Sequence, residues 1–122
     1  MAAPNIVNVT TITAKTVLDA DIAASESNFL ANSSSSGKVF KVNVLNIANI
    51  DGTNDATIKV GISRSTTTHY IASGINVPAA STLVVIGKDN GIYLEEGDTL
   101  TLEASAAGDL SAVCSYEEIT DD

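Results

Sequence analysis

Short runs in which apolar and polar residues alternate recur about every ten residues, and clusters of Gly, Asn, Asp and Ser separate them. Residues 56–63 and 99–106 show this alternation most clearly. A period of two places one face of a strand on a core and the other in water, whereas helical periodicity is weak throughout the chain. The sequence therefore predicts an all-β fold in one domain, residues 1–122. The expected architecture is a single antiparallel β-sandwich, jelly-roll-like or immunoglobulin-like, with about eight strands.

The expected strands cover residues 6–15, 27–31, 38–50, 56–63, 69–77, 81–88, 99–106 and 110–119. In the third strand, the apolar residues change parity between Val44 and Leu45, which predicts a bulge or a passage from one sheet to the other. Residues 81–88 are apolar on both parities, which indicates a strand covered on both faces, and one cover could be a neighbouring subunit. For residues 16–24, a helical turn and a connection between sheets both fit, and the short apolar spacing favours the connection.

The charge of the chain is unevenly placed. It has 15 acidic and 6 basic residues, a net charge of -9, and all of this net charge lies in residues 88–122. Excess negative charge repels a nucleic-acid backbone, so nucleic-acid binding is not expected. The acidic end is either a surface for a basic partner or cations, or a set of solvated turns that keeps a β-rich protein soluble. Charges on turns and edge strands commonly protect against aggregation, which favours the second interpretation.

Residues that carry chemistry are few. With one histidine, His69, and one cysteine, Cys114, the chain offers little material for a nucleophile beside a base. Cys114 alternates with apolar residues and is expected in the core. The carboxylates in residues 95–98 do not follow a calcium-loop pattern, and they and the oxygen-rich residues 49–55 are expected in turns, the latter in a hairpin turn. The sequence predicts no enzyme activity, no cofactor and no metal site.

No secretory signal is evident at the N-terminus, and the longest purely apolar run, residues 83–86, is far shorter than the roughly 20 residues that span a bilayer. We therefore expect the chain to stay in the cytoplasm in which it is made, without entering a membrane. The few aromatic residues, with no tryptophan, offer a thin platform for sugar rings. Tyr93 is either a packed hairpin residue or an interface anchor.

Two stretches carry a resemblance to a known family. They are LVVIGKDNGIYLEEGDTL at residues 83–100, followed by SYEEI at 115–119, and residues 39–62, where NIAN leads into DGTNDA. These stretches resemble a family of small virion structural proteins of tailed bacteriophages, especially phages of cyanobacteria and other aquatic bacteria. The resemblance implies a β-sandwich in the virion and provides no catalytic residues.

The leading hypothesis is a capsid decoration (cement) protein that binds the major capsid protein or other virion proteins as a homo-oligomer, with a trimer favoured. A neck, tail, baseplate or fibre-attachment component is the alternative within the virion, and a host glycan-binding module is the alternative outside it. An apolar N-terminal arm, residues 1–12, would add a strand to a neighbour's sheet edge. The candidate interface residues are Ile6, Val7, Val9 and Ile12 in the arm, together with Tyr93, Glu95, Glu96 and Asp98.

Overall fold

The computed structural model describes residues 7–120 and contains nine β-strands. The strands are β1 (Thr11–Asp19), β2 (Ser27–Ala31), β3 (Lys38–Asn49), β4 (Ala56–Arg64), β5 (Thr67–Val77), β6 (Thr82–Ile86), β7 (Ile92–Leu94), β8 (Thr99–Ala104) and β9 (Leu110–Thr120). A single 3-10 turn, Lys88–Asn90, separates β6 from β7 within these residues. The all-β prediction is confirmed.

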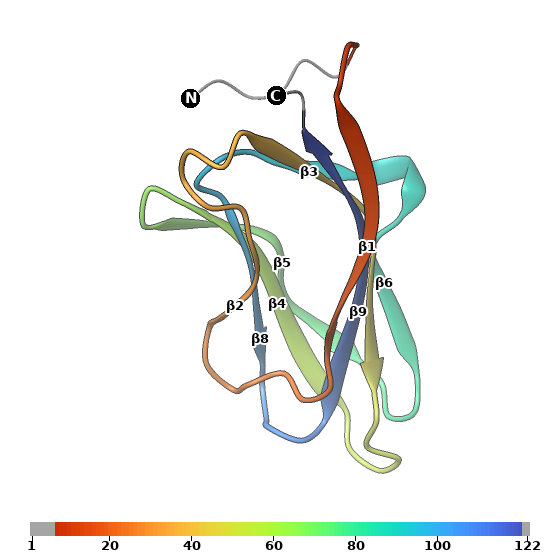
Figure 1. Ribbon diagram of the computed structural model, residues 1–122. Helices are drawn as coiled ribbons and strands as arrows, with labels where there is room; N and C mark the ends of the chain where they lie inside the picture. The colour runs from red at the N-terminus through yellow and green to blue at the C-terminus, as the bar shows by residue number, and fades with distance from the viewer. Residues whose placement is uncertain (1–6, 121–122) are drawn as a thin grey trace.

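The strands form two antiparallel sheets that face each other (Figure 1). Sheet A has the order β1-β9-β3-β6, and β7 also pairs with β3. Sheet B has the order β2-β8-β4-β5. Only the β4–β5 and β6–β7 connections stay within one sheet, and every other connection crosses to the opposite sheet. The result is a sandwich of two antiparallel sheets, as predicted.

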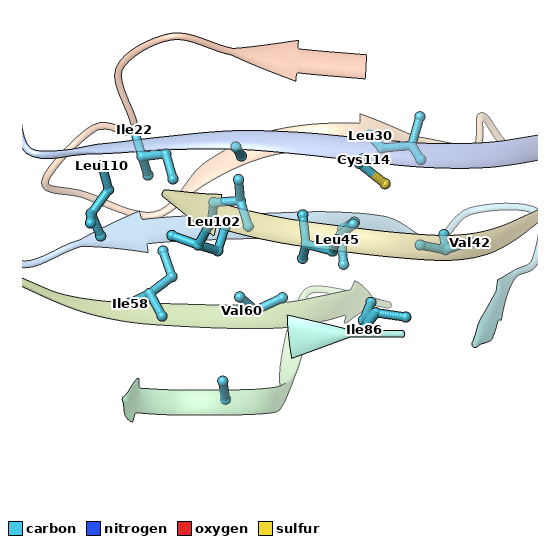
Figure 2. Close-up of a cluster of buried hydrophobic side chains, with 14 of the residues drawn as sticks. Ile22, Leu30, Val42, Leu45, Ile58, Val60, Ile86, Leu102, Leu110 and Cys114 are labelled. Carbon is cyan, nitrogen blue, oxygen red and sulfur yellow. The ribbon is translucent and has the colours of Figure 1, made fainter. Parts of the chain in front are cut away.

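The core lies between the sheets and follows the predicted alternation (Figure 2). In β4, Ile58 and Val60 are fully buried, and in β8 Leu100 and Leu102 point to the same interior. Cys114 of β9 is also buried there, as predicted. Burial of each large aliphatic side chain contributes about 1.5–3 kcal/mol, so this interior is the main source of stability.

The parity change in β3 is a pair of bulges. The register with β9 shifts between Val42 and Val44, and the register with β6 shifts between Leu45 and Asn46. Val42 and Leu45 are consequently both fully buried, although three positions separate them. An extra residue in one strand locally turns the following side chains over, so the prediction of a bulge is confirmed.

Several local predictions need correction. Residues 16–19 belong to β1 rather than to a connection, and the short strand β7 was not expected. The turn over residues 49–55 links β3 to β4, which lie in different sheets, so it is not a hairpin. Val84 in β6 is 60% exposed, so the protein's own chain covers one face of that strand, and a neighbouring subunit as the second cover stays a prediction.

Candidate assembly surfaces

The outer edge of β1 is open. Within the described residues β1 pairs only with β9, and its register runs without a shift from Thr11 opposite Thr120 to Asp19 opposite Ala112. Every residue from Thr11 to Thr16 is exposed, and the first half of the strand extends past the end of sheet B (Figure 1). A long regular edge presents N–H and C=O groups at alternate residues, so it can accept a strand from another chain.

Besides its backbone pairing with β9, an apolar and an ionic contact hold β1 in place. Val17 is half-buried against the core. The Glu118 carboxylate in β9 accepts hydrogen bonds from Lys15 Nζ at 3.0 Å and from Lys38 Nζ at 2.9 Å, so it joins β1, β9 and β3. The hydrogen bond from Lys38, supported by Lys15, holds the pKa of Glu118 below its usual range.

The residues predicted for an N-terminal arm divide into three groups. Ile6 lies outside the described residues. Val7 is exposed and Val9 is half-buried, both ahead of β1. Ile12 belongs to β1 and therefore pairs within the protein's own sheet. Thus the final residues of the predicted arm, residues 1–12, form part of sheet A.

The acidic turn between β7 and β8 is engaged within the chain. Asp98 is fully buried, and its carboxylate accepts hydrogen bonds from Arg64 Nε at 2.6 Å and Nη2 at 2.7 Å. These bonds hold the pKa of Asp98 below its usual range. The Glu95 carboxylate also accepts a hydrogen bond from Arg64, at 3.1 Å, and that of Glu96 accepts one from the backbone N–H of Gly37 at 2.6 Å. The assignment of Asp98 to an interface is corrected, because its carboxylate is buried against Arg64.

The outer face of sheet A carries a row of apolar side chains that sequence reasoning missed. Leu18, Val113 and Val84 are 68, 45 and 60% exposed, and Asn46 lies between Val113 and Val84 at directly paired positions. Among the described residues, the buried Oδ1 of Asn46 has no hydrogen-bond partner. Such an unpaired atom costs about 1–3 kcal/mol unless a partner supplies a donor. Tyr93 in β7 is 46% exposed on the same face, so its role as an interface anchor stays a prediction.

The chemically active side chains are dispersed. His69 is exposed in β5, and burial raises the pKa of the Cys114 thiol to about 11. Across residues 7–120, no three His, Cys, Asp or Glu side chains converge in a group that could hold a metal ion. A depression of about 200 Å³ on sheet B, beside Lys59 and Glu103, is smaller than the roughly 300–1,000 Å³ of small-molecule sites. The same part of the chain has no helix with the length and hydropathy needed to traverse a bilayer.

Comparison with known proteins shows the fold. No protein-family model matches the chain, and neither does any curated protein sequence. A solved structure described under "Bacillus endospore appendages form a novel family of disulfide-linked pili" is similar, with a TM-score of 0.54 and 22% identity. The match covers 92% of this chain and 90% of that one. A pentameric capsid protein from metagenomic phage sequences aligns with a TM-score of 0.39 and 20% identity, over 96% of this chain and 64% of that chain.

Proposed function

We propose that this chain is a non-enzymatic structural protein of a phage virion, and specifically a capsid decoration protein. The resemblance of residues 39–62, 83–100 and 115–119 to virion proteins of cyanophage and other aquatic phage type supports this assignment. The β-sandwich fold is compatible with it. The proposed partners are the major capsid protein or other virion proteins, and the proposed location is the virion.

The observation that carries the proposal is the open edge of β1. Nine residues of regular strand, exposed over most of their length, are poorly protected against pairing with another chain. In a particle, a strand from a neighbouring protein would add to β1 and continue sheet A through main-chain hydrogen bonds. The edge therefore gives a structural protein a means of attachment that needs no pocket and no catalytic group.

The fold neighbour from endospore appendages provides a useful contrast. That protein builds disulfide-linked pili, whereas the sole cysteine of this chain, Cys114, is fully buried in the core. A buried thiol with a raised pKa does not form intermolecular disulfides readily. We therefore propose that this chain assembles by non-covalent contacts.

A glycan-binding role receives less support. Sugar rings stack on exposed aromatic side chains, and the exposed tyrosines Tyr70 and Tyr93 belong to different sheets. They do not make one platform. A binding titration on host polysaccharide tests this alternative directly, and saturable binding would favour it over a virion role.

The decisive measurement is quantitative mass spectrometry of purified particles of the phage that encodes this chain. Hundreds of copies per particle, in fixed ratio to the major capsid protein, are expected for a decoration protein. A few to a few dozen copies would instead place the chain at the neck, tail or baseplate. Absence from particles would overturn the virion assignment.

A pair of proline variants tests the role of the β1 edge. Successive residues of a strand direct their N–H groups to opposite sides, so in one of the variants Thr13→Pro and Ala14→Pro the lost N–H is bonded to β9, and in the other it points to the open edge. The variant that loses a hydrogen bond to β9 is expected to lose about 1–3 kcal/mol of stability. The variant that loses an N–H on the open edge is expected to fold normally but to fall in copy number on particles. Normal incorporation of both folded variants would contradict attachment through β1.

A further inference from the structure

The longest stretch of the chain without a charged residue is residues 65–87. It contains β5, β6 and the turn between them, which are edge strands of sheet B and sheet A respectively. The two strands lie against each other on one side of the sandwich. Their free edges, with the connecting turn, form a surface that we name the β5–β6 side. In a chain with a net charge of -9, this side contributes no charged group of its own.

The β5–β6 side is also apolar. It carries four of the ten large hydrophobic side chains that are exposed in the described part of the chain. Tyr70, Ile71 and Ile75 of β5 are 49, 38 and 44% exposed, and Val84 of β6 is 60% exposed. Val84 lies on the outer face of sheet A and Tyr70, which pairs with Gly61, on that of sheet B, so the β5–β6 side is bordered by apolar side chains from both sheets. Exposed apolar side chains beside an uncharged edge are typical of a protein contact rather than of a solvated face.

The strands of this side are poorly suited to strand addition. The register of β5 with β4 shifts twice, once between Ser73 and Ile75 and once between Tyr70 and Ala72. Gly74, which lies in the first shift, has a φ of +90°. Bulges of this kind twist an edge away from a flat ladder, and β6 offers a short edge. The β5–β6 side therefore suits contact through side chains.

We propose that a second copy of this chain packs on the β5–β6 side. A basic partner would be drawn to residues 88–122, where all of the net negative charge lies, and an uncharged strip offers it no attraction. Two copies of an acidic chain repel each other, and they approach with least repulsion where neither contributes charge. The nearby Asp55 carboxylate already accepts hydrogen bonds from Asn76 Nδ2 and the backbone N–H of Ala79. This self-association concerns the chain in solution and does not depend on the virion assignment.

Sedimentation equilibrium of the purified full chain tests the proposal. We expect a concentration-dependent oligomer, and we expect it to tighten between about 0.1 M and 1 M NaCl as the Debye length falls from about 10 Å to about 3 Å. Association with a basic partner would weaken over the same range. A chain that remains monomeric at about 100 µM at both salt concentrations would overturn the proposal.

A matched pair of variants locates the contact. Val84→Lys places a charge on the β5–β6 side and is expected to weaken self-association at least about tenfold, because the contact would bury an unpaired ammonium. Ile12→Lys, at a similarly exposed position near the start of β1 and outside the row of Leu18, Val113 and Val84, makes the same change in net charge and is expected to leave association unchanged. Thermal unfolding confirms that both variants fold. Equal weakening by the two variants, or weakening by Ile12→Lys alone, would contradict the proposed location.

Discussion

The two lateral sides of the sandwich differ in how they are built. On one side, β1 of sheet A is regular, exposed and held by an ion pair and a half-buried valine. On the other side, β5 of sheet B is bulged twice and carries no charge. The buried side chains of Ala72 and Val77 anchor it to the core. The first side leaves its backbone open, and the second leaves apolar side chains open.

This difference shows that edge protection and surface polarity are separate properties. A bulged strand resists the addition of another strand even when its side chains are apolar. A regular strand accepts one even when many of its side chains are polar, because the bonds are made by the main chain. One small fold can therefore offer two kinds of contact that do not compete for the same residues.

Truncation of Val77 in β5 and of Val17 in β1 should show most strongly how differently the two edge strands are anchored. Val77→Ala in β5 removes two methyl groups from a fully buried site and is expected to cost about 2–3 kcal/mol. Val17→Ala in β1 changes a half-buried site and is expected to cost about 1 kcal/mol or less. Urea unfolding at pH 7 measures both values. Equal losses would mean that β1 is anchored as firmly as β5, and the contrast between the two sides would fail.

Asp98 joins the segment after β2 to the end of β4 and should respond to acid. Its backbone oxygen accepts the N–H of Asn32 after β2, at 2.9 Å, and its carboxylate binds Arg64, the last residue of β4. The pKa of Asp98 is lowered from 3.8 by Arg64. Its contribution is therefore present above about pH 4 and is lost as the pH falls through the lowered value.

Asp98→Asn is expected to cost about 1.5–3 kcal/mol at neutral pH and progressively less below about pH 4, where the wild-type carboxyl becomes protonated first in the unfolded chain and then, at its lowered pKa, in the folded protein. Glu118, whose pKa is also lowered, keeps part of the acid sensitivity in the variant. The pKa of Asp109 is raised, mainly by desolvation and by Asp51, so its effect on the pH dependence of stability is opposite in sign to that of Asp98. Stability curves at pH 3 and pH 7 check this. A difference between the two proteins that does not shrink with acid would contradict the role of the Asp98 charge.

The sequence predicted the fold well where the signal is local. The period of two in β4 and β8 places Ile58 and Leu102 in the core, and the change of parity in β3 marks a real bulge. Both signals depend on neighbours within a few positions. Side-chain alternation alone therefore sufficed to predict a sandwich.

Long-range contacts could not be predicted in this way. Arg64 and Asp98 lie 34 positions apart, and nothing near either one shows that they meet. Asn32 and Asn49 look like ordinary loop residues, yet both are buried, and their amides donate to carbonyls of distant segments such as Leu94 and Val77. The carboxylates of the acidic turn were expected at an interface for the same reason, since the groups that bind them, Arg64 and the backbone N–H of Gly37, come from distant segments of the chain.

The ionic anchor of β1 gives the smallest and most local effect. Glu118→Gln removes the charge that joins Lys15 and Lys38, and partly exposed pairs of this kind contribute at most about 1 kcal/mol. The amides of β1 are therefore expected to exchange hydrogen faster in the variant while those of β5 keep their rates, and the effect should diminish in high salt. Hydrogen exchange followed by mass spectrometry resolves the two strands. Faster exchange in β5 as well would show that Glu118 stabilises the whole sandwich, so that β1 would not be a separately held edge.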